Sequence, residues 1–108
     1  MKWIFATAVA FALGGCSMTL PVTGQSDAGD EIFTGSATGE LDGAGTLTIR
    51  SDRGKVCSGT FVYVTRRNGE GTFNCTNGQS GSFSFVSTGT RGTGRGSIGG
   101  KPFTFTFG

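Results

Sequence analysis

Glycine that alternates with aromatic and β-branched residues is the feature that most constrains this chain. Glycine is the most abundant residue, at 21 of 108, and each glycine inside a helix costs about 1 kcal/mol relative to alanine. Leucine and alanine, which favour helices, are absent after residue 47. The apolar residues that remain there are mostly Phe, Val and Ile, which suit a pleated sheet. The sequence therefore predicts an all-β fold with many turns.

Small or polar residues alternate with apolar ones at a period of two, which is typical of half-buried strands. The clearest runs are Gly45–Ile49, Thr60–Tyr63, Ser82–Phe85 and Phe103–Phe107. Strong turn pairs lie between these runs, because Asx-Gly pairs tolerate positive φ. They are Asp42-Gly43, Asn68-Gly69 and Asn77-Gly78.

A weak internal repeat accompanies the alternation. The pattern Gly-x-Gly-Thr/Ser-apolar starts at Gly43 and returns at Gly69 and Gly94, while Gly-x-Phe starts at Gly59 and returns at Gly81. Each unit holds two strands and a turn, so the repeat predicts a β-hairpin used about three times. A single hairpin cannot bury an apolar face. We therefore expect an antiparallel meander of Gly-rich hairpins, as a single twisted sheet or a small open barrel.

At these residues the chain resembles the MORN family (membrane occupation and recognition nexus repeats), over about residues 35–98. The closest match runs from Cys57 through Gly59-Thr60-Phe61 and Gly69–Phe73 to Asn77-Gly78. Cys57 stands where the family usually has tyrosine, and the connection 64–68 is longer than usual. The resemblance implies an elongated, twisted antiparallel sheet with a scaffold or binding role.

Two strand registers are open for the hairpin that contains Cys57 and Cys75. If Phe61 pairs with Gly71, the two cysteines lie directly opposite each other, with Cβ atoms ~4.5–5.5 Å apart, which is near the spacing that a disulfide needs. The bridge would stabilise the fold by roughly 3 kcal/mol. A two-residue turn centred on Asn68-Gly69 would instead set Cys75 against Val62 and exclude the bridge. The sequence favours the register that pairs the cysteines.

The favoured register places an aromatic stripe on one face of the sheet. Phe61, Tyr63 and Phe73 share this face with both cysteines, and the stripe continues through Phe83, Phe85, Phe103, Phe105 and Phe107. We expect the stripe to be the core. The alternative is a partly exposed stripe that serves as a platform for a ligand.

The first sixteen residues resemble the export signal of bacterial lipoprotein precursors. Lys2 precedes an apolar run, Trp3–Leu13, that is too short to span ~30 Å of bilayer core, and Leu13-Gly14-Gly15-Cys16 resembles the lipobox. The resemblance implies a signal peptide over 1–15 and a covalent lipid on Cys16. Because Ser17 follows the cysteine, it also implies anchoring in the periplasmic leaflet of the outer membrane. Residues 16–30 are expected to be a flexible tether, and residues 31–108 the folded domain.

Basic residues are concentrated in the second half of the chain. Such asymmetry can mark an anionic partner, here lipid head groups or other anionic envelope polymers rather than nucleic acid. The alternative interpretation is solvated strand edges that discourage pairing with other chains. The candidate residues are Arg50, Arg53, Lys55, Arg66, Arg67, Arg91, Arg95 and Lys101.

Catalytic chemistry is hard to assemble from this sequence. The chain contains no histidine, which removes the commonest general base and metal ligand, and two cysteines alone do not make a zinc site. The sequence therefore predicts no catalytic residues, no metal and no cofactor other than the lipid. It favours a non-enzymatic structural or binding module of the cell envelope, held at the membrane by its lipid anchor. The alternative is a lipid-anchored inhibitor or adaptor that binds an envelope protein through an aromatic sheet face or an open strand edge.

Overall fold

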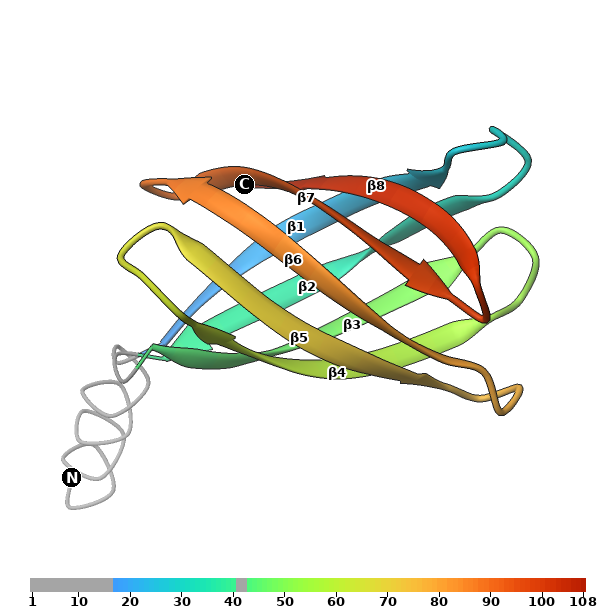
Figure 1. The fold of residues 1–108 in the computed structure, drawn as a ribbon, viewed down its shortest axis with the longest axis horizontal. Coiled ribbons are helices and arrows are strands. Elements are labelled where there is room, and N and C mark those ends of the chain that lie inside the picture. Colours follow the sequence, from blue (N-terminus) through green and yellow to red (C-terminus); the bar gives the residue numbers. More distant parts are fainter. Residues whose placement is uncertain (1–16, 41–42) are drawn as a thin grey trace, which may run out of the picture.

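The computed structural model describes residues 17–40 and 43–108, which form eight antiparallel strands. Each strand pairs with the next, and the last pairs with the first, so the sheet is a closed barrel (Figure 1). The strands are β1 (Ser17–Ser26), β2 (Ile32–Glu40), β3 (Ala44–Ser51), β4 (Val56–Tyr63), β5 (Asn68–Cys75), β6 (Ser80–Thr88), β7 (Arg91–Ile98) and β8 (Lys101–Phe107). The all-β meander is confirmed. The twisted open sheet, the open barrel and the elongated sheet implied by the MORN resemblance are wrong.

Closure of the barrel depends on β1, which lies within the segment expected to be a tether. β1 pairs with β2 along its whole length and with β8 from Val22 to Ser26. Val22 and Ser26 point inward and are buried. The prediction of a flexible tether over 16–30 is therefore wrong for Ser17–Ser26, because two neighbouring strands supply the hydrogen bonds that this polar segment lacks alone. Residues 1–16, with the predicted signal peptide and the lipidation site Cys16, lie outside the described residues.

The β4–β5 hairpin adopts the register that pairs the cysteines. Phe61 lies opposite Gly71, Cys57 lies opposite Cys75, and the two cysteines form a disulfide. The register with a two-residue turn at Asn68-Gly69 is wrong. The connection 64–67 is longer, and Thr65 Oγ1 stabilises it by accepting a hydrogen bond from the Asn68 backbone N–H at 3.0 Å.

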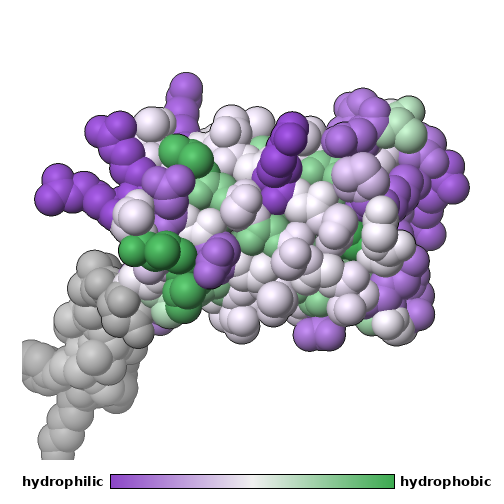
Figure 2. Space-filling model, viewed as in Figure 1, coloured by the Kyte–Doolittle hydropathy of each residue, from purple (hydrophilic) through white to green (hydrophobic). Residues whose placement is uncertain are grey.

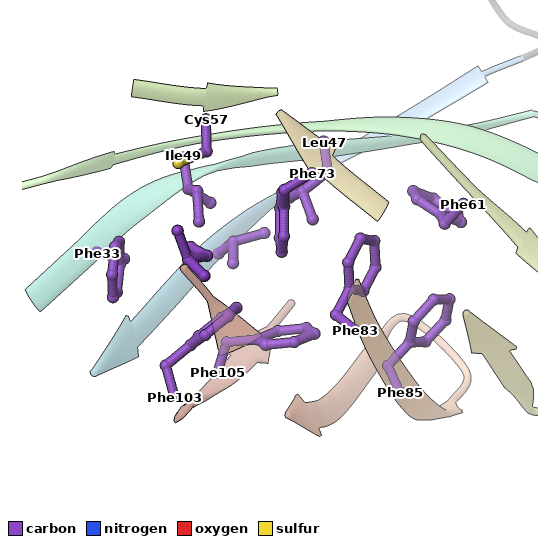
Figure 3. Close-up of a cluster of buried hydrophobic side chains, with 12 residues drawn as sticks. Phe33, Leu47, Ile49, Cys57, Phe61, Phe73, Phe83, Phe85, Phe103 and Phe105 are labelled. Atoms are coloured by element: carbon purple, nitrogen blue, oxygen red, sulfur yellow. The ribbon is translucent and has the colours of Figure 1, made fainter. Parts of the chain in front are cut away.

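The core combines aliphatic side chains and Cys57 with phenylalanine rings, several of which lie over glycines of the neighbouring strands. Phe61 lies opposite Gly45 and Gly71, and Phe83 lies opposite Gly71 and Gly96. A Cβ atom added at Gly71 would overlap the Phe83 ring, so this position needs the absence of a side chain rather than a special backbone angle. The rings point toward the barrel axis (Figure 3). The prediction that the aromatic stripe is the core is confirmed for its six buried phenylalanines, but Phe107 is only partly buried and Tyr63 is exposed.

The two ends of the barrel differ in the connections that they carry. One end, called the mouth below, carries the connections 64–67 and 89–90 and both termini of the described barrel, Ser17 and Gly108. The other end, called the base, carries the connections 27–31, 52–55, 76–79 and 99–100. The mouth is at the left of Figure 1 and the base at the right.

Candidate functional site

The barrel interior is hollow at the mouth, where it forms a cavity of about 300 Å³. Aromatic side chains from β4, β6 and β8 line one part of the cavity, among them Phe61, Phe85 and Phe107. Aliphatic side chains from β1, β2 and β3 line another part, including Leu20 and Leu47. The cavity can therefore hold an apolar group between rings and aliphatic chains.

The aromatic wall is held in a fixed arrangement of edge-to-face contacts. The Phe85 ring centroid lies 5.4 Å from that of Phe61, 5.3 Å from that of Tyr63 and 5.6 Å from that of Phe107, with interplanar angles of 87–90°. The Tyr63 hydroxyl donates a hydrogen bond to Oγ of buried Ser87 at 3.1 Å. Because each ring is braced by another, the wall is preorganised for a ligand.

The cavity exists because β2 presents small residues at the mouth. β2 contributes the buried ring of Phe33 toward the base but Ala37 and Gly39 toward the mouth. A Cβ atom built on Gly39 would meet no heavy atom within 4 Å. The volume is about twice the ~150 Å³ of an apolar cavity that binds benzene. The site is therefore large enough for a small apolar molecule.

The cavity also borders a gap in the barrel wall. β1 extends past the end of β8, so residues 17–20 pair with β2 alone among the described residues. Gly89 and Thr90, in the turn between β6 and β7, line the cavity together with Met18 of this stretch. A ligand can therefore approach from the mouth and from the side of β1.

A cluster of ion pairs closes the opposite end of the lumen. Glu31 is 1% exposed, and its Oε1 lies 3.4 Å from Nζ of Lys55 and 3.5 Å from Nζ of Lys101. Asp30 Oδ2 lies 2.9 Å from Nζ of Lys101 and 3.7 Å from the guanidinium of Arg53. The lumen is thus polar and filled at the base but apolar and hollow at the mouth.

The cluster shifts the pKa values of its own members. The Ser26 hydroxyl, which donates to Asp30 at 2.7 Å, and then Lys101 lower the pKa of Asp30 to about 2. Burial alone would raise the pKa of Glu31, but the Ser51 hydroxyl and the two lysines outweigh it, so this pKa is lowered. The hydrogen bond to Asp30 raises the pKa of Lys101.

Acid unfolding should reveal the role of Asp30. A carboxylate whose pKa is lower in the folded state contributes stability above its unfolded pKa and loses it as the pH falls through the folded value. We therefore expect the melting temperature of the wild type to fall between about pH 4, the unfolded value, and about pH 2. Asp30→Asn should show a shallower decline in circular-dichroism melts across this range, and Asp27→Asn, on an exposed neighbour, should follow the wild type. Equal slopes for all three proteins would contradict the assignment.

The basic residues proposed from the sequence do not form one surface. Those of the base, Arg53, Lys55 and Lys101, pair with Asp30 or Glu31. Those of the mouth, Arg66, Arg67 and Arg91, are exposed and form no ion pair with any described residue. Arg50 and Arg95 lie on the outer face of β3 and β7. Within the described part of the chain, the mouth group alone offers a cluster of positive charge that forms no ion pair.

Sequence reasoning missed both the cavity and the buried Glu31. The alternation predicted which side chains share a face, but not that the sheet would close around them. The available signal for the cavity was Ala37-Thr38-Gly39, because β4, β6 and β8 carry aromatic residues at their inward positions near the mouth. Glu31 gave no signal, because its lysine partners lie 24 and 70 residues away along the chain.

Within the described ranges, no group of His, Cys, Asp and Glu side chains could hold a metal ion. Nor does any helix in this part of the chain have the length and apolar character needed to cross a membrane.

Comparison with known proteins identifies similar folds but no relatives. No protein-family model matches the sequence, and no curated protein matches it. The structure is similar to that of a redesigned β-barrel, mFAP1, solved bound to DFHBI, with a TM-score of 0.68, 14% identity, and coverage of 82% of this chain and 90% of that chain. It is also similar to that of a fluorescence-activating β-barrel designed de novo, with a TM-score of 0.64, 12% identity, and coverage of 82% and 88%. At these identities the likeness concerns the fold alone.

Proposed function

We propose that this chain is an exported lipoprotein of the bacterial cell envelope whose barrel is a non-enzymatic binding module. Cys16 carries the lipid, and the ligand is a small apolar molecule held in the cavity at the mouth. The anchor rests on the lipobox-like Leu13-Gly14-Gly15-Cys16. The binding role rests on the cavity.

The observation that carries the binding role is an apolar cavity beside a fully packed core. The remainder of the lumen is filled by rings that fit over glycines, so the small residues Ala37 and Gly39 leave space at one place. Few polar groups line the cavity, and the Tyr63 hydroxyl is already bonded to Ser87. These properties favour a ligand recognised by shape and apolar contact. Ligand binding within a barrel of this fold has a precedent in mFAP1, which was solved bound to DFHBI.

An adaptor that acts through an aromatic face or an open strand edge is less well supported. The rings face the lumen, and the strands pair on both sides over most of their length. Such an adaptor would have to use the outer surface or the short stretch of β1 that extends past β8.

Titration with a neutral dye tests the binding role. N-phenyl-1-naphthylamine fluoresces in apolar surroundings, and we expect the full chain to bind it at a single site with a Kd of about 100 μM or below. Ala37→Phe places a phenyl group in the cavity and should weaken binding at least about tenfold. The measurement is the fluorescence increase during titration, with a circular-dichroism melt to confirm that each variant is folded.

Ser36→Phe is the matched control, because it adds the same group to the exposed outer face of the same strand. Gly39→Leu is a second test, since its side chain would enter space that no atom occupies. Equal dye affinity in Ser36→Phe, Ala37→Phe and the wild type would remove the cavity as the binding site.

A further inference from the structure

The mouth of the barrel combines exposed apolar side chains with arginines that form no ion pair with any described residue. We infer that this end docks directly on an anionic lipid bilayer, so that the cavity opens against the membrane. The contact surface, called the mouth patch below, consists of Met18, Tyr63, Val64, Arg66, Arg67 and Arg91. It is an interaction surface in addition to the lipid on Cys16, and it does not depend on which ligand the cavity holds.

Exposed apolar side chains gather at the mouth. The large hydrophobic residues with the greatest exposure are Met18, Ile32, Val62, Tyr63, Val64 and Val86, at 36–62%. All but Ile32 lie in the half of the barrel nearest the mouth. Figure 2 shows apolar groups in green beside long hydrophilic side chains in purple at the left, which is the mouth in this view. This combination is typical of surfaces that lie in a membrane interface.

Charge is distributed unequally between the two ends. At the base, Asp27, Asp30, Glu31 and Asp52 balance Arg50, Arg53, Lys55 and Lys101. Among the described residues of this end, Arg66, Arg67 and Arg91 outnumber the acidic Glu40 and Glu70, and Glu70 lies opposite the exposed Val62. Arg95 lies farther along the outer wall. The mouth is therefore positive, and a surface rich in anionic lipid would attract it.

The connection 64–67 presents its arginines in a defined way. The Thr65 hydroxyl donates to Oδ1 of Asn68 at 3.1 Å and accepts the Arg67 backbone N–H at 3.3 Å, while the Arg67 carbonyl accepts the Ser87 backbone N–H at 2.8 Å. These bonds fix the backbone, and the Arg66 and Arg67 side chains are left exposed. Val64, which is 62% exposed, belongs to the same connection. An apolar side chain and two basic side chains are therefore exposed together at the mouth.

The course of the chain brings the mouth to the membrane. Ser17 belongs to the mouth and directly follows the apolar run Trp3–Leu13 and Cys16 in sequence. Whether a lipid or the apolar run itself enters the bilayer, the barrel is attached at its mouth. A lipid anchor combined with a basic patch is the two-part arrangement that gives stable membrane attachment.

Depth-dependent quenching of tryptophan tests the inference on the full chain. In a Trp3→Phe background, Val64→Trp reports the mouth and Ala28→Trp reports the base. Vesicles contain phosphatidylcholine with brominated acyl chains, with or without phosphatidylglycerol. We expect quenching and a blue shift for the tryptophan at position 64 in phosphatidylglycerol vesicles, and neither for the tryptophan at position 28.

Charge reversal separates docking from simple tethering. Each basic residue near an anionic surface changes membrane association about fivefold, so Arg66→Glu with Arg67→Glu should lower the ratio of docked to undocked barrel by roughly 25-fold or more. High salt should have the same effect. Arg50→Glu with Arg95→Glu makes the same change of net charge away from the mouth and should leave quenching intact.

Three results would overturn the inference. They are equal quenching at positions 64 and 28, equal quenching with and without phosphatidylglycerol, and quenching that survives the Arg66→Glu, Arg67→Glu pair. The first would mean that the barrel is tethered without docking at its mouth, and the second and third would mean that contact of the mouth with the bilayer does not depend on anionic lipid or on these arginines. The dye titration described above uses no vesicles, so failure of docking and failure of ligand binding are told apart.

Discussion

Replacing Gly69 with alanine should destabilise the barrel by about 2–3 kcal/mol, as overpacking of a dense core does. A Cβ atom at this position would overlap the ring of Phe85, and the nearest atoms are all from that ring. Movement of the Phe85 ring away from the new methyl group would disturb its contacts with the rings of Phe61, Tyr63, Phe83 and Phe107. Urea unfolding followed by circular dichroism gives the difference in free energy of unfolding.

Gly39→Ala is the matched control, because it makes the same substitution in a strand where the new methyl group meets no atom within 4 Å. Neither glycine has a positive φ, so alanine fits both backbones. We expect Gly39→Ala to be neutral or to stabilise by about 0.4–1 kcal/mol through the unfolded chain.

A double-mutant cycle identifies the Phe85 ring as the cause. Phe85→Leu alone should destabilise by removing ring contacts, but combined with Gly69→Ala it should cost less than the sum of the two single changes. Additive effects, or equal effects of alanine at positions 39 and 69, would contradict the role of glycine as space for a ring.

The fold class and the core could be predicted from the sequence because both depend on local alternation. A period of two fixes which side chains share a face, and for this reason Phe61, Phe73 and Phe83 were placed in the core correctly. The register of the β4–β5 hairpin could be predicted because a disulfide needs its two cysteines close together. Only one of the two possible registers places Cys57 opposite Cys75.

Closure of the barrel could not be predicted, because it depends on partners distant in sequence. β1 pairs with β8, and Thr23 lies opposite Thr106. β1 contains Pro21 and Gly24 and few large apolar residues, so by itself it resembles a tether. This segment forms a strand because β2 and β8 supply partners for its backbone hydrogen bonds. Closure also removes the exposed edges of an open sheet.

The candidate site illustrates the same limit. A cavity forms where side chains are too small to fill the space between strands. Ala37 and Gly39 could not be identified as lining a cavity from the sequence, because this depends on aromatic side chains of β4, β6 and β8 that lie across the lumen. The basic residues likewise separate into a group at the base that forms ion pairs and a group at the mouth that forms none with the described residues, and this separation follows from which turns meet at each end.

Replacing Lys55 with methionine should destabilise the protein by about 3 kcal/mol at neutral pH, because loss of one partner leaves a buried charge poorly compensated. Glu31 is 1% exposed and Lys55 14% exposed. Oε2 of Glu31 has no hydrogen-bond partner among the described residues, so the carboxylate depends on the Ser51 hydroxyl and on its two lysines. Lys101 remains at 3.5 Å but also pairs with Asp30. Denaturant unfolding measures the loss, and Arg50→Met, on the exposed face of β3, should stay within about 0.5 kcal/mol of the wild type.

Two further measurements separate loss of charge compensation from loss of packing. The Ser51 hydroxyl and the two lysines lower the pKa of Glu31, so its stabilising contribution is present above its unfolded pKa and fades as the pH falls through the folded value. The difference between Lys55→Met and the wild type should therefore shrink on acidification below about pH 4. Glu31→Leu combined with Lys55→Met removes both charges and should recover most of the lost stability, since an apolar pair of similar size can replace a buried ion pair. A deficit that stays constant with pH and persists in the double variant would mean that Lys55 acts through its aliphatic chain.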